Sequence, residues 1–485
     1  MSRLRLSLVI TFFSSNGATA VNFVVTIVLA RLLSPSEIGI FSITAVITAI
    51  AHIFRDFGVG SYLQREKDLT PEKVRAAIGV LLTSSWSIAL LLFILSGYAA
   101  DYYRQPGIQP IMQVLAMGFL FIPFGSVTHA LLTREFRAKE QAMVNVAGTT
   151  AYATSSIVLA LLGFSYMSMA WANLINIIVT SLAYVPFRPK NAPWLPSFRG
   201  WRKVVNFGTG AILGNSVGAM NNAMPDMVLG KVSGAHDVGI MSRATSTTNI
   251  FTQIAGPTVH YAVLPYLAQK HHDGESLRDP LSQAVSYLTV FAWPAIFVTA
   301  VFAQQIVLFL YGEKWLECVP IIRVICLMTA LGIPFNFNGA ALMAIGRPYL
   351  AVMPAAALLL LRIGAIVVLY DGTLVSFAYA LVLASLFIYP IQFWLQKRYL
   401  DFHIPAFLKA QSKSMGIALA CALAAYGIDL ALPKMPPGIE LAILAAALIP
   451  FWILLIIRLK HPMLNELTLL GQRLPLIGKL LRISS

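Results

Sequence analysis

The stretch Val28-Leu-Ala-Arg-Leu-Leu-Ser-Pro-Ser-Glu-Ile-Gly-Ile-Phe-Ser42 returns 200 positions later as Val228-Leu-Gly-Lys-Val-Ser-Gly-Ala-His-Asp-Val-Gly-Ile-Met-Ser242. Between positions 22 and 50, eight of 29 residues are identical at this offset, where composition alone would give roughly two. A second echo pairs Ile122-Pro-Phe124 with Ile333-Pro-Phe335. The sequence therefore predicts a duplicated chain whose two halves share one fold.

The chain around these repeats is too hydrophobic for a water-soluble protein. Of its 485 residues, 58% are hydrophobic and only 11% are charged, and the mean hydropathy is +0.75. A membrane-spanning helix needs about 20 apolar residues, so fourteen such helices would occupy about 280 residues and leave mostly short connections. We therefore expect an all-α integral membrane protein without a large soluble domain.

Apolar runs separated by charged or Pro/Gly-rich breaks predict fourteen spans. They lie near 8-31, 36-59, 76-98, 109-131, 142-163, 165-187, 204-231, 239-267, 281-311, 319-345, 349-370, 374-396, 413-431 and 438-457. The repeat unit holds six spans, an even number, so both halves should have the same orientation in the membrane. We expect an N-terminal lobe (1-190), a linker with a C-terminal lobe (191-400), and two added spans with a tail (401-485).

The net charge of +15 indicates orientation in the membrane. Most lysines and arginines fall on one set of loops, whereas the other side holds Arg31, Arg104, Lys231, Lys314 and Lys434. Because cytoplasmic loops are enriched in Lys and Arg, this asymmetry predicts that both termini are cytoplasmic, and it argues against nucleic-acid binding. The basic, leucine-rich segment 458-485 is typical of an amphipathic helix on the cytoplasmic leaflet, or of a simple anchor for the last span.

Polar residues recur at helical spacing in the first pair of spans of each half. The predicted polar stripes include Ser15, Asn22 and Thr26 in the first span, Asn215 and Asn222 in the seventh, and Asn249 and Gln253 in the eighth. Residues three or four apart share one face of a helix. We interpret these faces as the lining of a hydrated central cavity; the alternative is that they hydrogen-bond neighbouring helices.

Ionisable residues within the spans are mostly cationic. The candidates for anion binding are Arg31, Arg55, Lys231, Arg243, Arg323 and Arg362. Arginine binds phosphate through two parallel hydrogen bonds and keeps its proton, so the surplus favours a phosphate-bearing substrate. For single members the alternatives are snorkelling to the interface, as for Arg31, Lys231 and Arg323, or pairing with a carboxylate, as for Arg55.

Carboxylates in the same regions raise the question of ion coupling. Asp226 lies within a polar stripe and Asp56 follows Arg55 directly. Each is a candidate proton or sodium site, or a fixed counter-charge for an arginine. The three cysteines, Cys318, Cys326 and Cys421, are too scattered for a disulfide framework or a thiolate metal site. We predict no metal and no cofactor, with coupling to H⁺ or Na⁺ left open.

Several motifs resemble the polysaccharide transporter family. They are Leu29-Ala-Arg-Leu-Leu-Ser-Pro-Ser-Glu-Ile-Gly-Ile-Phe41, Asp56-Phe-Gly-Val-Gly-Ser-Tyr-Leu-Gln-Arg65, Leu131-Leu-Thr-Arg-Glu-Phe-Arg137 and Asp226-Met-Val-Leu-Gly-Lys231. These are Wzx-type flippases of the multidrug/oligosaccharidyl-lipid/polysaccharide exporter superfamily. The resemblance implies two six-helix lobes, a cationic central cavity, and movement of an undecaprenyl-pyrophosphate oligosaccharide across the bacterial inner membrane for exopolysaccharide, capsule or O-antigen synthesis. By likeness to lipid II flippases, the last two spans would form a groove for the polyprenyl tail.

Two other functions remain to be weighed. A cation-coupled multidrug exporter of the same superfamily would favour acidic and aromatic walls, whereas the surplus here is basic. A glycan polymerase or glycosyltransferase would need catalytic carboxylates or histidines on a sizeable loop, and the predicted connections are short. We therefore expect a monomeric transporter, not an enzyme, whose partners are membrane lipids and polysaccharide polymerase or export machinery.

Overall fold

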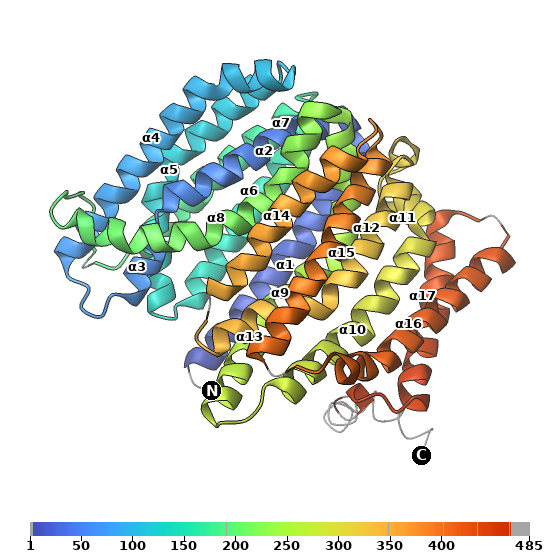
Figure 1. Cartoon of the computed structure of the whole chain (residues 1–485). Coiled ribbons are helices and arrows are strands. Elements are labelled where there is room, and N and C mark those ends of the chain that lie inside the picture. Colours follow the sequence, from blue (N-terminus) through green and yellow to red (C-terminus); the bar gives the residue numbers. More distant parts are fainter. Residues whose placement is uncertain are drawn as a thin grey trace. The chain divides into compact units, whose positions relative to one another are not determined.

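The computed structural model describes residues 3–190, 192–347, 349–400, 402–433, 435–464 and 466. Within these residues the regular structure is entirely helical (Figure 1). The chain folds as two compact units, Met1–Ser242 and Arg243–Ser485. The boundary between these units lies within a helix. The predicted boundaries at 190/191 and 400/401 were based on the repeat and on the two added spans, and these boundaries stay predictions.

The first unit contains eight α-helices and the start of a ninth within its described residues. They are α1 (Arg3–Leu32), α2 (Pro35–Asp56), α3 (Val59–Arg65), α4 (Pro71–Tyr103), α5 (Ile108–Arg134), α6 (Ala138–Leu161), α7 (Met167–Tyr184), α8 (Trp201–Val232) and α9 (Ala235–His272). Neighbouring helices pack as α4 on α5, α5 on α7, α7 on α6, and α6 on α1. Helix α2 packs against α4, α5 and α8.

Local sequence explains the breaks between these helices. Ser34 caps α2: its side chain accepts a hydrogen bond from the Glu37 backbone N–H, and the Glu37 carboxylate accepts one from the Ser34 backbone N–H. Such a capping box satisfies amide groups that the first turn leaves open. Phe57 and Gly58 both have positive φ and end α2, so the chain turns and starts the short helix α3. The predicted second span, 36-59, thus ends just past this break, and the hydropathy pattern did not reveal the separate helix α3 that follows.

The second unit continues α9 and adds eight α-helices within the described residues. They are α10 (Arg278–Val301), α11 (Ala303–Leu310), α12 (Cys318–Gly332), α13 (Asn338–Ala344), α14 (Tyr349–Leu369), α15 (Leu374–Tyr399), α16 (Ile404–Ala431) and α17 (Pro437–Arg458). The Ile333-Pro-Phe335 repeat forms a 3-10 turn between α12 and α13, whereas its counterpart Ile122-Pro-Phe124 lies inside the continuous helix α5. Most of the predicted basic tail, from residue 467 on, lies outside the described residues.

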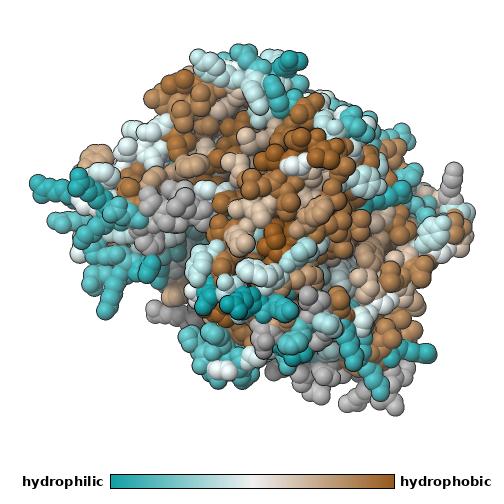
Figure 2. Space-filling model, in the orientation of Figure 1, coloured by the Kyte–Doolittle hydropathy of each residue, from teal (hydrophilic) through white to brown (hydrophobic). Residues whose placement is uncertain are grey.

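Twelve helical segments of the described chain are long and apolar enough to cross a membrane. They bear large exposed apolar side chains; Val367 and Val368 of α14, for example, are 79% and 78% exposed. Figure 2 shows many apolar residues at the surface of the helices in view. Lipid can cover such a surface at no hydrophobic cost. The all-α membrane fold is confirmed with twelve candidate spans; the predicted seventh and eighth spans are the more polar helices α8 and α9.

The two copies of the repeated stretch lie against each other within the first unit. A Cβ atom on Gly39 of α2 would lie 1.6 Å from the Ala235 carbonyl oxygen, and one on Gly239 of α9 would lie 1.9 Å from the Pro35 carbonyl oxygen. Three residues further on, the Ser42 hydroxyl donates to the Ser242 hydroxyl over 3.3 Å. All three pairings are reciprocal at an offset of 200, the arrangement expected of two helices related by a twofold axis. Glycine is required at both positions because each helix touches the backbone of the other.

Candidate functional site

A polar cavity of about 350 Å³ lies inside the first unit. Its walls come from the end of α2, one face of α3, and the facing surfaces of α5 and α7. The polar side chains that line it are Arg55, Asp56, Ser61, Gln64, Ser126, His129, Thr180, Ser181 and Tyr184. A concentration of polar groups within apolar helices is costly unless they have a function or satisfy one another, so the cavity is the candidate site.

Arg55 is the main charged group of this cavity. Its side chain is 13% exposed, and Nη1 donates to the Ser126 hydroxyl over 3.3 Å. The Asp56 carboxylate lies 4.0 Å from Nη2 and is 42% exposed, so it neutralises the guanidinium only in part. Among the described residues, the buried Arg55 Nε has no hydrogen-bond partner. A buried guanidinium with an unused donor is suited to an anion that enters the cavity, because the planar fork matches phosphate oxygens.

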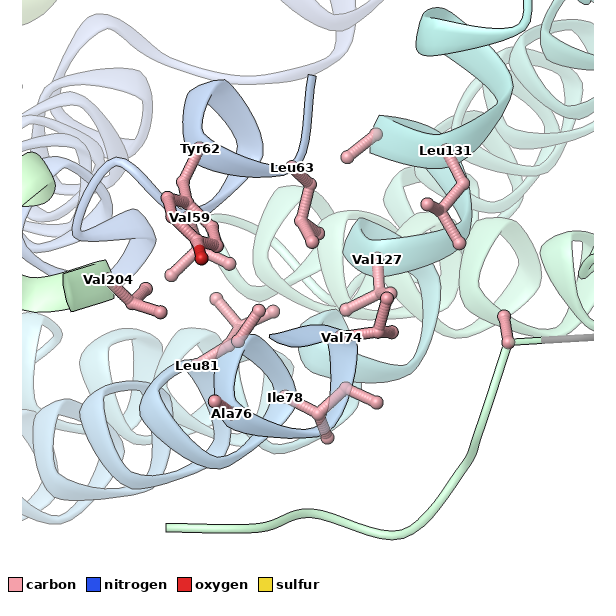
Figure 3. Close-up of a cluster of buried hydrophobic side chains, with 13 residues drawn as sticks. Val59, Tyr62, Leu63, Val74, Ala76, Ile78, Leu81, Val127, Leu131 and Val204 are labelled. Carbon is pink, nitrogen blue, oxygen red and sulfur yellow. The ribbon is translucent and has the colours of Figure 1, made fainter. Parts of the chain in front are cut away.

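One face of helix α3 lines the cavity, and the opposite face packs into the protein interior. Gly60, Ser61 and Gln64 line the cavity. On the opposite face, Val59, Tyr62 and Leu63 pack into a buried cluster with side chains of α4, α5 and α8, among them Leu81, Val127 and Val204 (Figure 3). Burial of these apolar side chains fixes the rotation of α3, since a turned helix would expose them.

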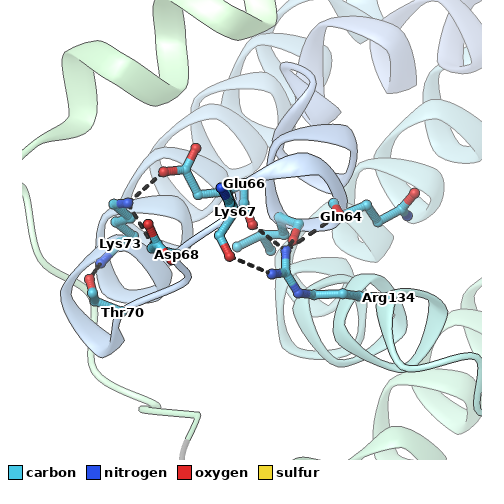
Figure 4. Close-up of polar contacts among 8 residues, drawn as sticks. Gln64, Glu66, Lys67, Asp68, Thr70, Lys73 and Arg134 are labelled. Carbon is cyan, nitrogen blue, oxygen red and sulfur yellow. Dashed lines mark hydrogen bonds and ion pairs between the residues drawn. The ribbon is translucent and has the colours of Figure 1, made fainter.

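Arg134 at the end of α5 holds the C-terminal end of α3. Its guanidinium donates to the carbonyl oxygens of Leu63, Gln64, Glu66 and Lys67 (Figure 4). The last carbonyls of a helix have no intrahelical partner, and a guanidinium can satisfy several of them together. Next to it, the Lys73 ammonium donates to the Glu66 carboxylate and lowers the pKa of that group. These bonds keep Gln64 in position at the cavity wall.

A hydrogen-bonded pair, His129 and Tyr184, closes the side of the cavity formed by α5 and α7. The His129 Nδ1 and the Tyr184 hydroxyl are 2.8 Å apart. Gly125 of α5 allows the approach, because a Cβ there would lie 3.1 Å from the Tyr184 ring and 3.2 Å from the Ser181 backbone. The Thr180 hydroxyl donates to the carbonyl oxygen of Asn176, and the Ser181 hydroxyl donates to that of Phe121. Their oxygens remain available as acceptors.

The predicted site residues are distributed over several elements. Arg55 and Asp56 line this cavity together. Lys231, at the exposed end of α8, donates to the Tyr102 carbonyl oxygen over 2.7 Å and lines a second cavity of the same unit, of about 710 Å³. Arg323 is exposed and donates to the Ala300 carbonyl oxygen. Their role in binding stays a prediction.

The other predicted residues are not among those that line the polar cavity. Three of them, Arg31, Asn22 and Asn222, have exposed side chains. The side chains of six others are half-buried: Arg243, Arg362, Asp226, Ser15, Thr26 and Asn249. The side chains of Asn215 and Gln253 lie outside the described residues. The predicted cavity-facing stripes are therefore neither confirmed nor contradicted.

The sequence analysis missed most of the cavity's polar lining. His129 had a usable signal, because an ionisable side chain within a predicted span is unusual. Ser61 and Gln64 had none, because the hydropathy pattern does not show that α2 ends at Asp56 and that a separate helix follows.

The second unit contains a larger cavity of different character. It has a volume of about 820 Å³ and lies among α10, α12, α16 and α17. Its wall is almost entirely apolar, with side chains such as Phe291, Ile296, Leu444, Leu448 and Trp452. The hydroxyls of Thr299 and Thr329 face it but donate to carbonyl oxygens of their own helices, and the Trp452 indole N–H donates to Val290. This wall is suited to a hydrocarbon ligand.

Comparison with known proteins gives a consistent set of relatives. Residues 28–320 match the family described as polysaccharide biosynthesis protein. The teichuronic acid biosynthesis protein TuaB of Bacillus subtilis (strain 168) is 22% identical over 90% of this chain and 92% of its own length. The lipopolysaccharide biosynthesis protein WzxC of Escherichia coli (strain K12) is 24% identical over 66% of this chain and 65% of its own. A solved structure of the lipid II flippase MurJ in an inward closed conformation covers 94% of this chain and 98% of its own, with a TM-score of 0.73 at 13% identity.

Proposed function

Because the chain belongs to the polysaccharide biosynthesis protein family, we propose that it moves a polyprenyl-pyrophosphate-linked oligosaccharide across the bacterial inner membrane. The observation that carries this proposal is the partly neutralised Arg55 guanidinium in a polar cavity of a membrane protein. The likeness to TuaB, WzxC and the lipid II flippase fold supports a lipid-linked glycan as substrate. The protein is a transporter of polysaccharide biosynthesis and not an enzyme.

We extend the twelve candidate spans to fourteen by adding α8 and α9. Both helices are long enough to cross a bilayer, at 32 and 38 residues. Helices that line a hydrated path must carry polar side chains, which lowers their mean hydropathy. Fourteen spans place both termini on one side, and the loop charges put that side in the cytoplasm.

The pyrophosphate is the group that Arg55 binds. Its guanidinium has an unused Nε donor and is held in place by Ser126. A phosphate group that leaves water for this cavity loses hydrogen bonds to water. Charge-assisted hydrogen bonds to the guanidinium would replace them. Arg31, Lys231, Arg243, Arg323 and Arg362 remain candidates for further phosphate contacts along the path, and the polar stripes of α1, α8 and α9 for contacts with hydroxyl groups.

The polyprenyl tail occupies the apolar cavity among α10, α12, α16 and α17. The walls offer hydrocarbon contacts, and their few hydroxyls are already bonded internally. A tail held there by hydrophobic contacts needs no specific polar recognition. The added helices α16 and α17 thereby acquire a function in substrate binding.

The decisive experiment is translocation in proteoliposomes that contain only this protein. The probe is undecaprenyl pyrophosphate carrying a short oligosaccharide, and the readout is its appearance on the opposite leaflet. Arg55→Ala should slow translocation at least about tenfold, the effect of losing a charge-assisted hydrogen bond to phosphate. Arg398→Ala, an exposed arginine at the end of α15, is the matched control and should transport normally. Full activity of Arg55→Ala would overturn the phosphate site.

The same assay addresses energy coupling. An imposed H⁺ or Na⁺ gradient that accelerates translocation makes Asp226 and Asp56 the first residues to neutralise, by Asp→Asn substitution. Gradient-independent movement indicates facilitated flipping, driven by consumption of the product outside. Transport of organic cations in place of the lipid-linked glycan would support a multidrug exporter.

A further inference from the structure

The wall of the polar cavity facing Arg55 is rich in uncharged hydrogen-bonding groups. Ser61 and Gln64 of α3 make no side-chain hydrogen bond within the described part of the chain. Thr180 and Ser181 of α7 retain acceptor capacity after donating to backbone carbonyls. The cavity therefore holds more donors and acceptors than a phosphate bound to Arg55 would use.

The His129–Tyr184 pair forms another part of this wall. The two groups share one hydrogen bond of 2.8 Å, and Gly125 lets the backbones of α5 and α7 approach closely behind it. After that bond is made, the tyrosine oxygen still has a free lone pair or proton, and the imidazole retains its second nitrogen, Nε2. A hydrogen-bonded pair of this kind can discriminate between ligands. A ligand whose hydroxyl is wrongly placed leaves the polar groups of the pair without a partner, which costs binding free energy.

The charges of the lining exclude a densely anionic ligand at this wall. The ionic groups there are Arg55 and Asp56, 4.0 Å apart, so once Arg55 has bound the pyrophosphate, any further anionic group would meet a carboxylate and no additional lysine or arginine. An apolar ligand would leave the amide and hydroxyl groups without partners. A sugar fits, since each of its hydroxyls both donates and accepts. The volume of about 350 Å³ is near the lower end of the range for ligand pockets, roughly 300–1,000 Å³, and so suits one sugar ring better than a whole oligosaccharide.

We propose that this cavity is a recognition subsite for the first sugar of the substrate, a neutral hexose bonded to the pyrophosphate that Arg55 binds. His129 contacts its hydroxyls from α5, Tyr184 from α7 and Gln64 from α3. This inference rests on the proposed function and deepens it, because it names the part of the substrate that the N-terminal unit selects. Sugars further from the pyrophosphate lie outside the subsite and vary without loss of recognition.

Equilibrium binding to the purified full-length protein tests the subsite. The two probes are undecaprenyl pyrophosphate without sugar and the same lipid carrying a single glucose. The wild type should bind the glucosylated lipid at least about tenfold more tightly, since several hydrogen bonds are added. Tyr184→Phe and Gln64→Ala should each reduce this ratio about fivefold to tenfold while binding of the sugarless lipid is preserved. Preserved binding also shows that the variants are folded.

Two controls separate the possible failures. Tyr379→Phe, an exposed tyrosine of α15, should leave the ratio unchanged, and Arg55→Ala should weaken both lipids together. Equal wild-type affinity for the two lipids, or an unchanged ratio in Tyr184→Phe, would overturn the subsite and leave the proposed function standing. Failure of the wild type to bind either lipid would overturn the proposed function itself.

Discussion

Arg134 shows how one side chain can organise a site that it does not line. Its guanidinium bonds four carbonyl oxygens at the end of α3, which carries Ser61 and Gln64 into the cavity wall. Three of these bonds come from Nη1 and the one to Lys67 comes from Nη2. Lysine has the same charge but a single compact ammonium group, which cannot take the place of both nitrogens. The arginine is therefore required for its shape as well as its charge.

We predict that Arg134→Lys destabilises the protein by about 1–2 kcal/mol, because carbonyls at the α3 end lose their partners. The change should lower the thermal midpoint of the detergent-purified protein and slow translocation. The matched control is Arg137→Lys, whose guanidinium pairs at the surface with Glu140 and should change stability by less than about 0.5 kcal/mol. Equal midpoints for the two variants would contradict the role given to Arg134.

His461 provides a prediction for pH. It is 1% exposed, its Nε2 lies within hydrogen-bond distance of the Ser286 and Ser414 hydroxyls, and its Nδ1 accepts from the Met463 backbone N–H. Burial, together with Lys413, lowers the pKa of His461 to about 4. The folded protein thus keeps the ring neutral, whereas an unfolded chain protonates it near pH 6.5. The contribution to stability is complete above pH 6.5 and is lost as the pH falls toward 4.

Thermal midpoints measured between pH 4.5 and 7.5 check this expectation. His461→Gln should make the midpoint less dependent on pH over that interval, and His272→Gln, at an exposed position, should leave the dependence as in the wild type. The same pH dependence in His461→Gln and the wild type would show that other groups cause it.

At the scale of the elements, the crossing of α2 with the first turns of α9 depends on glycine. The Cβ positions calculated for Gly39 and Gly239 fall inside contact distance of backbone carbonyl oxygens, which cannot move aside as a side chain can. The helices must therefore separate if either glycine is replaced. This explains why glycine occupies both copies of the repeated stretch.

We predict that Gly39→Ala destabilises the protein by about 1–3 kcal/mol through overpacking. Gly97→Ala in α4 is the matched control, because no atom lies within 4 Å of its Cβ position and alanine favours the helix by about 0.5–1 kcal/mol. Thermal unfolding in detergent distinguishes the two. Equal stability of both variants would show that α2 and α9 are less tightly packed than the structure indicates.

At the scale of the whole molecule, we expect transport by alternating access, in which tight contacts open during the cycle. The reciprocal contact of α2 and α9 is a suitable place to test this, because the Ser42 and Ser242 oxygens are 3.3 Å apart. A disulfide between cysteines at these positions would keep the two helices together. The native Cys318, Cys326 and Cys421 are buried and form no disulfide in the part of the chain that the structure describes.

We predict that the double variant Ser42→Cys/Ser242→Cys forms a disulfide under oxidising conditions and stops translocation, and that a reductant restores it. The single variants Ser42→Cys and Ser242→Cys, treated alike, should keep transporting. A cross-linked protein with full activity would show that this crossing stays closed throughout the cycle.

The sequence by itself determined the fold class and the family, because both depend on patterns that are local or repeated along the chain. Apolar runs of sufficient length predict helices that cross a bilayer, and the 200-residue offset predicts a duplicated chain. The reciprocal packing of Gly39 and Gly239 was seen only in the structure. Residue type and spacing also indicated that Arg55 belongs among functional candidates.

Only the tertiary structure decided what surrounds Arg55. Its partner Ser126 lies 71 residues away, and His129 meets Tyr184 across 55 residues. No periodicity within one helix shows which face of another helix it will meet, because this depends on packing of side chains from several helices together. Packing also placed Gln64 at the cavity. It set the rotation of α3 through buried Leu63 on one side of the helix and the Arg134 bonds at its end.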